Sequence, residues 1–371
     1  MTDVLPEKTE VDATIKVVTD HADRIFLWDY TRGRDQLVTL YNKAMASQWN
    51  SVTELDWATD VDPEHLVATM PNQGMVVGLA RQAKEMPGSP LATWSDKEFT
   101  ALGIEMLKAQ LSQFVHGEQG AMMVAAKIVE TVPWIDARYY AATQTMDEAR
   151  HTEVFAKYLQ TKLGDFYPMS APLEAQVTDL IEDSRWDIAY LGMQIVIESL
   201  ALAAFGSMLR SVEEPLLKKL LRYVMSDEAR HVAFGVLSLS EYYQELTAAE
   251  LKERQEFLAE NTMRSRSRSA FPEMWERLGV DFDAAAPFLA EAAKANKGTG
   301  MYGGFFQGFY AKLVPNTRKL GLLDANDGYL RGLWAESGML AYEHADDTAS
   351  DFEAYDEVAK DRAARTGAGS R

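Results

Sequence analysis

The chain has 371 residues, a formal net charge of −19 and no cysteine. This length can bury one large core or two ordinary ones. The acidic balance disfavours nucleic acid and anionic membranes as partners, because both require a basic surface. Without cysteine, disulfides, zinc–thiolate sites and iron–sulfur clusters are excluded, so any metal must bind carboxylates and imidazoles.

The first 94 residues are predicted to form an irregular arm. Short helices are expected over about 34–46 and 76–84, and several prolines interrupt the rest of the arm. The polar, acidic N-terminus lacks the basic and apolar regions of a secretory signal, so we expect a cytoplasmic protein.

Residues 95–246 are predicted to form a four-helix core. Ser95 and Glu98 match a capping box and begin a long helix that should end near Thr131, before Pro133. The same 3.6-residue periodicity then predicts helices over about 134–163, 174–211 and 215–244. The expected fold is all-α, because strand signals are scarce.

The C-terminal third is predicted to add further helices to the core. Thr247 and Glu250 cap the next helix, and residues 247–350 should pack on the bundle. Residues 351–371 are charged and end in ARTGAGSR, so a flexible tail is expected there.

An apolar stretch from Ile188 to Leu209 is long enough to cross a bilayer. However, Glu198 lies at its middle, where a charge in a membrane costs most. We therefore interpret the stretch as a buried central helix and expect no membrane span.

The core contains an internal repeat. Residues 147–151 and 227–231 both read Asp-Glu-Ala-Arg-His, at an offset of 80 residues (227 − 147). The same offset relates Glu118 to Glu198. The repeat predicts two helical hairpins with matching internal spacing.

Each repeated motif places an acid and an imidazole on one helix face. Residues three apart on a helix share a face, so Glu148 lies beside His151 and Glu228 lies beside His231. One such pair alone is usually a solvated face, and the duplication could carry no site.

The two lone glutamates make the pattern more specific. Glu118 and Glu148 lie at equal distances along the chain from Pro133, so an antiparallel hairpin brings them to the same height. Glu198 and Glu228 have the same relation about the second turn. The full candidate set for two metal ions is Glu118, Glu148, His151, Glu198, Glu228 and His231.

Supporting roles follow for the remaining charged residues of each motif. Metal-bound histidines usually donate their second N–H to a carboxylate, a carbonyl or water. We expect Asp147 and Asp227 each to support the histidine of the opposite hairpin, with Arg150 and Arg230 holding these aspartates. Exposed salt bridges on the helix flanks are the alternative.

At these residues the sequence resembles the ferritin-like di-iron carboxylate superfamily. The similarity is to its oxygen-activating branch: monooxygenase hydroxylases, soluble desaturases, and ribonucleotide reductase small subunits with their oxidase relatives. The resemblance covers about 110–240 and implies a ferritin-like four-helix bundle with additional N-terminal and C-terminal helices. It implies one iron on Glu118, Glu148 and His151 and another on Glu198, Glu228 and His231, with Glu148 and Glu228 bridging.

The sequence departs from each subgroup of that branch. Phe155 stands where ribonucleotide reductase small subunits usually carry a radical tyrosine. The turn after Glu198 lacks the threonine of hydroxylases and desaturases. The turn before Glu228 lacks the third histidine of arylamine N-oxygenases.

The resulting hypothesis is an O₂-dependent oxidoreductase of the monooxygenase or oxidase type. Its cofactor would be two iron ions, with Mn/Fe as an alternative, and its substrate a small, mostly apolar organic molecule. The alternatives are a metal-bearing subunit that supports a partner enzyme, and a ferroxidase that handles iron. Residues expected to line the substrate pocket are Phe114, Ala121, Met122, Phe155, Gln194, Ala201, Leu202 and Phe234.

Turnover would need an external electron donor, either a reductase or a ferredoxin. Arg264, Arg266 and Arg268 form a basic run that could dock an acidic ferredoxin, although a solvated loop is the simpler interpretation. A homodimer is also expected.

Overall fold

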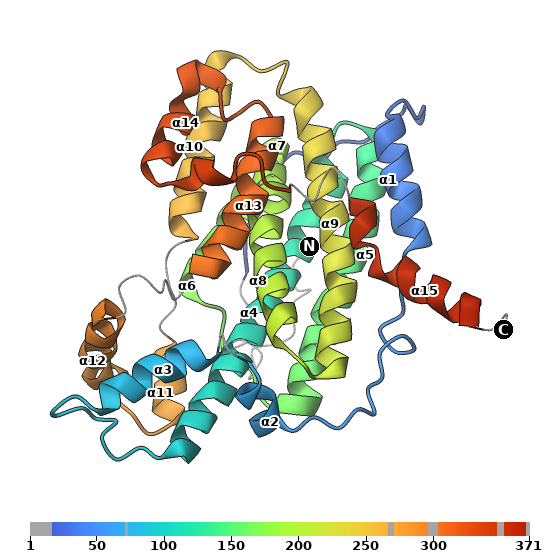
Figure 1. Cartoon of the computed structure of the whole chain (residues 1–371). Coiled ribbons are helices and arrows are strands. Elements are labelled where there is room, and N and C mark those ends of the chain that lie inside the picture. The colour runs from blue at the N-terminus through green and yellow to red at the C-terminus, as the bar shows by residue number, and fades with distance from the viewer. Residues whose placement is uncertain (1–16, 71–72, 266–270, 296–302, 347–351, 369–371) are drawn as a thin grey trace.

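The computed structural model describes residues 17–70, 73–265, 271–295, 303–346 and 352–368 (Figure 1). Within these ranges every regular element is helical. The prediction of an all-α, ferritin-like bundle with additional helices is confirmed. The elements are α1 (Asp35–Ala46), α2 (Pro63–Ala68), α3 (Gln73–Lys84), α4 (Asp96–Thr131), α5 (Ile135–Tyr158), η2 (Leu159–Leu163), α6 (Ala171–Glu182), α7 (Trp186–Tyr190), η3 (Leu191–Ile197), α8 (Glu198–Ser211), α9 (Pro215–Tyr242), α10 (Ala248–Arg264), α11 (Pro272–Arg277), α12 (Phe282–Ala295), α13 (Gly303–Lys319), α14 (Ala325–Glu336), η4 (Met339–Tyr342), η5 (Phe352–Tyr355) and α15 (Glu357–Ala368).

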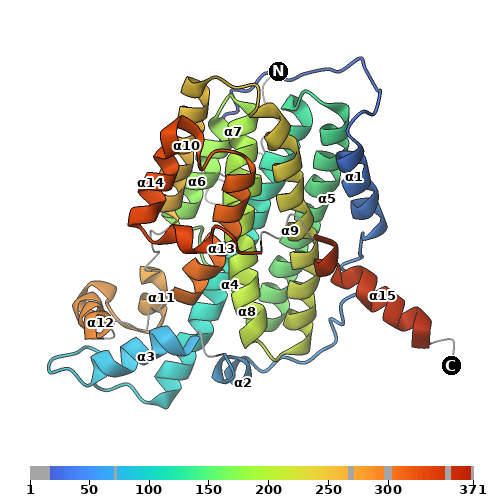
Figure 2. The same cartoon turned by 45° about the horizontal axis from the view of Figure 1, so that its top comes forward.

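Two antiparallel hairpins form the central bundle. Helix α4 pairs with α5, and the continuous run α7–η3–α8 pairs with α9 (Figures 1 and 2). The capping box predicted for α4 is present, because Glu98 accepts the N–H of Ser95 at 2.6 Å. Helix α9 begins at Pro215, where Glu214 accepts the N–H groups of the first turn.

The third core helix differs from its prediction over 174–211. It is divided into α6 and α7 because Asp183 is extended and its carboxylate accepts the N–H of Arg185 at 2.8 Å. Lys127 of α4 donates to the carbonyls of Ile181 and Asp183, at 2.6 and 2.5 Å, and so satisfies the end of α6. The break therefore combines a local turn at Asp183 with a contact from another helix.

The apolar stretch forms a helix over Trp186–Ser211 that by composition could span a membrane. In the structure, 89% of its most apolar window is buried inside the protein. It is therefore a buried core helix, as predicted from the charge of Glu198 at its middle.

A layer of polar side chains divides the bundle core into two apolar clusters. One cluster includes Ala121, Tyr140 and Phe234. The other includes Phe155 and Phe205. The candidate metal ligands lie between these clusters on the four core helices, so the site has an apolar wall on each side.

The added helices surround this bundle. Helix α1 packs against α5 and α9, and α13 packs against α8 (Figure 2). The expected helix over 34–46 is therefore present, and the one over 76–84 begins earlier, at Gln73. Helix α2 is not predicted, because Pro63 is one of the prolines expected to interrupt the arm. Pro63 instead begins the helix, and the Asp62 side chain caps it.

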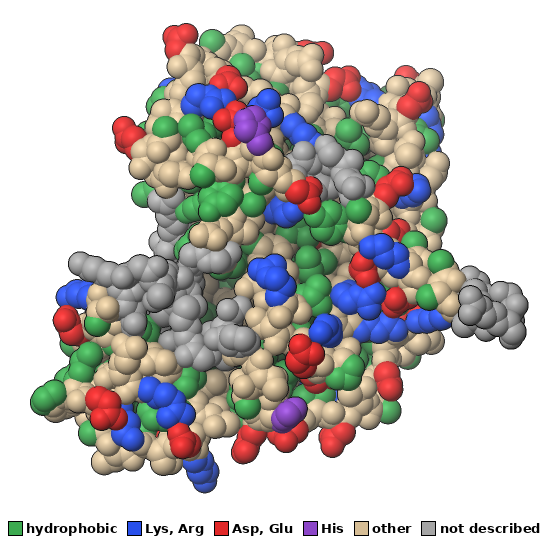
Figure 3. All heavy atoms as spheres, in the orientation of Figure 1, with side chains coloured by type: hydrophobic (Ala, Val, Ile, Leu, Met, Phe, Trp, Pro, Cys, Tyr) green, Lys and Arg blue, Asp and Glu red, His purple; other side chains and the backbone are tan. Residues whose placement is uncertain are grey.

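The expectation of a flexible tail over 351–371 is wrong for residues 352–368. Glu357 pairs with Arg222 at 2.5 Å, and Val358 is fully buried. Asp361 accepts a hydrogen bond from Tyr223 at 3.0 Å. Figure 3 shows charged side chains of both signs where α15 meets α9. The charges that predicted disorder therefore find partners on a distant helix.

Candidate metal centre

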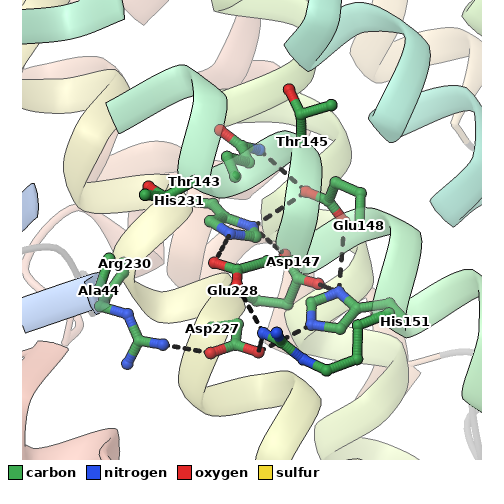
Figure 4. A network of polar contacts seen from close by, with 12 residues as sticks. Ala44, Thr143, Thr145, Asp147, Glu148, His151, Asp227, Glu228, Arg230 and His231 are labelled. Atoms are coloured by element: carbon green, nitrogen blue, oxygen red, sulfur yellow. Dashed lines mark hydrogen bonds and ion pairs between the residues drawn. The ribbon is translucent and has the colours of Figure 1, made fainter. Parts of the chain in front are cut away.

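The six predicted ligands converge at the middle of the bundle, although they come from four helices. They are Glu118 of α4, Glu148 and His151 of α5, Glu198 of α8, and Glu228 and His231 of α9. None of the six is more than 5% exposed. Figure 4 shows the motif residues of α5 and α9 facing one another across the bundle.

The first group of donor atoms surrounds Nδ1 of His151. This atom lies 3.3 Å from Oε2 of Glu118, 3.2 Å from Oε2 of Glu148 and 3.0 Å from Oε1 of Glu228. One donor atom from each of these four residues lies within 4.8 Å of all the others. We call this group position A.

The second group surrounds Nδ1 of His231. This atom lies 3.1 Å from Oε1 of Glu148, 3.6 Å from Oε1 of Glu198 and 2.9 Å from Oε2 of Glu228. We call this group position B. Glu148 and Glu228 each contribute one oxygen to A and the other to B, which is the geometry of bridging carboxylates.

The far side of each imidazole contacts the opposite hairpin. Nε2 of His151 lies 2.9 Å from Asp227, and Nε2 of His231 lies 3.4 Å from Asp147. This is the crossed arrangement predicted from the motifs. Arg150 forms ion pairs with both aspartates, at 2.5 Å from Asp147 and 3.0 Å from Asp227. Arg230 forms an ion pair with Asp227 and not with Asp147.

Two residues of the N-terminal arm complete this outer layer, and the sequence reasoning missed both. Trp49 donates its indole N–H to Asp227 at 2.8 Å, and Gln48 donates to Asp147 at 2.8 Å. Arg150 also donates to Gln48 at 2.8 Å. No spacing signal could have identified them, because the arm lies outside the repeat.

Gln144 was also missed, although a signal was available. It lies four residues before Glu148 and therefore on the same face of α5. Its side-chain amide donates to Glu148 and to Glu198, both at 3.0 Å. It also pairs with Gln194, a residue that was predicted to line the pocket.

Burial and neighbouring charges divide the acids of the site into two kinds. Burial, with the charge of Glu228, raises the pKa of both Glu118 and Glu198 well above the ordinary value. Burial acts the same way on Glu148, but the charge of His231 holds the pKa of Glu148 low.

The two imidazoles respond in the opposite direction. Burial would lower the pKa of each histidine, but hydrogen bonds from His151 to Asp227 and the charge of Glu148 near His231 raise both pKa values well above 6.5. Protons therefore partly balance the buried negative charge.

This donor set fits two divalent cations. Asp147 and Asp227 pair with Arg150 and Arg230. Among the residues that the structure describes, the four glutamates of the site then have only the two histidines as cationic partners. Oε1 of Glu228 is buried, and its contact with Nδ1 of His151, at 3.0 Å, lacks the geometry of a hydrogen bond. Two divalent ions would balance four carboxylates, and oxygen donors with some imidazole suit iron and manganese.

The predicted pocket residues lie on the two sides of the site. On the side of Glu118, the ring of Phe114 lies 5.5 Å from that of Phe155 and 4.7 Å from that of Phe205. Phe205 is not among the predicted pocket residues. On the other side, Phe234 packs 4.3 Å from Tyr140. The four other apolar residues predicted to line the pocket follow Glu118 or Glu198 by about one helical turn: Ala121, Met122, Ala201 and Leu202.

Two pockets of about 340 and 570 Å³ lie elsewhere on the protein. The first includes Asp179 and Arg264 in its lining, and the second includes Thr53 and Lys219. The substrate pocket beside the metal positions therefore stays a prediction.

No model of a known protein family matches the chain, and no curated protein matches it. Similar solved structures are variants of an R2-like ligand-binding oxidase. One, with an aerobically reconstituted Mn/Fe cofactor, is 15% identical; the match covers 76% of this chain and 94% of that chain, with a TM-score of 0.45. Another, with an anaerobically reconstituted Mn/Fe cofactor, is 15% identical, with 79% and 94% covered and a TM-score of 0.47.

Proposed function

We propose that the protein is an O₂-dependent oxidase or oxygenase with a two-metal cofactor, either Fe/Fe or Mn/Fe. Its substrate would be a small, mostly apolar organic molecule. The observation that supports this proposal is the pair of donor groups that share Glu148 and Glu228. A cofactor of two redox-active ions would supply electrons to O₂.

The side chains of the site have separate tasks in this proposal. Asp227 and Asp147 hold the imidazoles so that Nδ1 points inward. Glu118 and Glu198 release protons when metal binds, since burial raises their pKa values in its absence. The apolar clusters on either side exclude water from the reacting groups.

The apolar ring cluster beside Glu118 favours an apolar substrate. Phe114, Phe155 and Phe205 offer ring surfaces and no hydrogen-bonding group. The side of Glu198 instead presents the amides of Gln144 and Gln194. We therefore place the organic substrate on the Glu118 side.

The remaining parts of the proposal concern partners and location. Electrons would come from an external reductase or ferredoxin, and the protein would be a cytoplasmic homodimer. The basic run is one candidate docking site for the donor. Its Arg264 forms ion pairs with Asp179 and Glu260, while Arg266 and Arg268 lie outside the described residues.

Anaerobic loading of the metal-free protein with Fe(II) tests the metal site directly. About two ions per chain should bind, and admission of O₂ should produce a transient absorption band. Glu198→Ala should lose at least one ion, whereas Glu182→Ala, which changes an exposed glutamate of α6, should keep both. Equal metal content in the two variants would refute the ligand role of Glu198.

Product analysis separates this proposal from its alternatives. An oxidase or oxygenase should consume O₂ and convert an added apolar substrate when a chemical reductant is supplied. A ferroxidase would oxidise Fe(II) repeatedly without an organic product. A subunit that supports another enzyme would show no turnover until that partner was added.

A further inference from the structure

Positions A and B differ in the side chains beside them. At B, Gln144 donates to Glu148 and Glu198, both at 3.0 Å. Gln194 donates to the side-chain carbonyl oxygen of Gln144 at 2.8 Å, and its own carbonyl oxygen lies 3.1 Å from the Gln144 amide nitrogen. We call these two residues the amide pair. Both are fully buried, so their contacts are held without competition from bulk water.

The internal repeat shows that position A has no such pair. The offset of 80 residues relates Gln144 to Val224 (144 + 80) and Phe114 to Gln194 (114 + 80). Val224 is buried in an apolar cluster, and the ring of Phe114 packs against Phe155 and Phe205. Apolar residues thus stand at A where amides stand at B.

The amide of Gln144 lies where it can orient two ligands of B. Carboxylate oxygens that approach one another repel, and an N–H group placed between them offsets part of that repulsion. Gln144 Nε2 contacts the same oxygen of Glu148 and of Glu198 that faces His231. Gln194 donates to the side-chain carbonyl oxygen of Gln144 at 2.8 Å, and this hydrogen bond fixes the direction of the amide.

We propose that Gln144 is a positioning residue that makes the two metal positions unequal and favours binding at B. The inference rests on the proposed function, because it assumes that A and B bind metal. Second-shell hydrogen bonds of this kind contribute roughly 10–100-fold to metal affinity.

Gln144→Met tests this in two backgrounds, since methionine keeps the length of the side chain and removes its N–H donors. The Glu118→Ala background should keep position B alone, and the Glu198→Ala background should keep A alone. Titration of metal-free protein with Mn²⁺, followed by electron paramagnetic resonance of the free ion, measures each affinity. Gln144→Met should weaken binding about 10–100-fold in the first background and by less than about threefold in the second.

Two further variants guard against a general effect on folding. Gln194→Met should weaken B by less than Gln144→Met does, because Gln194 acts only through Gln144. Val224→Ala alters the repeat-related position and should leave binding at B unchanged. Thermal unfolding of each metal-free variant shows whether it has folded, and Gln194→Met carries the test if Gln144→Met does not fold.

The possible outcomes separate this inference from the proposed function. The role of Gln144 would be overturned, and the two-metal proposal left intact, if Gln144→Met weakened metal binding equally at A and B. The same would follow if Val224→Ala weakened binding at B as much as Gln144→Met does. An unchanged affinity in Gln144→Met would do the same. Failure of the unaltered protein to bind Mn²⁺ or Fe²⁺ at all would overturn the proposed function and this inference together.

Discussion

Nε2 of His151 lies 2.9 Å from Oδ2 of Asp227, a residue of the other hairpin. The reciprocal contact between His231 and Asp147 is longer, at 3.4 Å. The motif repeat thus produces a crossed pair of contacts, in which each hairpin orients the imidazole of its partner. Each aspartate also accepts from Arg150 and from one residue of the arm, and Asp227 has a further ion pair, with Arg230.

Asp227→Asn should weaken metal binding at position A by roughly 10–100-fold, because His151 loses the carboxylate that orients it. The substitution also leaves two buried arginines without their shared acid, which should cost about 3–5 kcal/mol of unfolding free energy. Asp147→Asn is the matched control and should have a smaller effect on metal binding. The measurements are Mn²⁺ titration and urea unfolding, and equal metal affinities in both variants would contradict the prediction.

Glu148→Gln should impair both metal positions, whereas Glu118→Gln should impair only one. The reason is that Glu148 offers one oxygen to each histidine-centred group, while Glu118 contacts only that of His151. Metal analysis after anaerobic Fe(II) loading should find markedly less than one ion per chain in the first variant and about one in the second. One tightly held ion in Glu148→Gln would show that its two oxygens do not serve separate ions.

The metal-free protein should lose stability as the pH rises from about 5 to 8. The folded pKa values of His151 and His231 are raised well above 6.5, so their contribution is complete below 6.5 and is lost as the pH rises through the folded values. Glu118 and Glu198 act in the same direction, because the folded protein keeps protons that the unfolded chain releases above about 4.5.

Thermal unfolding at several pH values, with a chelator or with excess Mn²⁺, checks this dependence. Bound metal should replace the retained protons and flatten the profile above pH 6 or so. Below about pH 4 stability should fall again, since the pKa values of Glu148 and Asp227 are lowered in the folded state. A metal-free profile that rises towards pH 8 would contradict the assigned directions.

Removal of residues 352–371 should lower the unfolding free energy by roughly 2–4 kcal/mol. The deletion exposes the surface under Val358 and removes the carboxylates that pair with Arg222. Denaturant unfolding of the shortened chain measures the loss. The replacement of Lys360, an exposed residue of α15, by alanine should change stability by less than about 0.5 kcal/mol. If the deletion left the unfolding free energy unchanged, these residues would form the flexible tail that their composition predicts.

The sequence predicts the centre of the molecule better than its edges, and the reason is periodicity. Glu148 and His151 lie on one helix face wherever that helix is placed, and Pro133 sets the height of Glu118 beside them. Two independent patterns, the helical face and the repeat, therefore locate the same side chains. The fold class follows from the same regularity.

Features that depend on distant contacts could not be predicted in this way. Trp49 reaches Asp227 only because α1 packs against α5 and α9. The end of α6 depends on Lys127 of another helix, and α15 depends on Arg222 of α9. In each case a local pattern is compatible with several structures, and a tertiary contact selects one of them.

The crossed histidine–aspartate contacts also affect how an ion would leave. His151, Glu148, Glu228 and His231 are fully buried, and their outer partners join the two hairpins. Escape of a cation would therefore require the hairpins to part, and not merely a ligand to rotate. Chelators should then extract metal slowly, at a rate set by opening of the bundle, even where the equilibrium favours extraction.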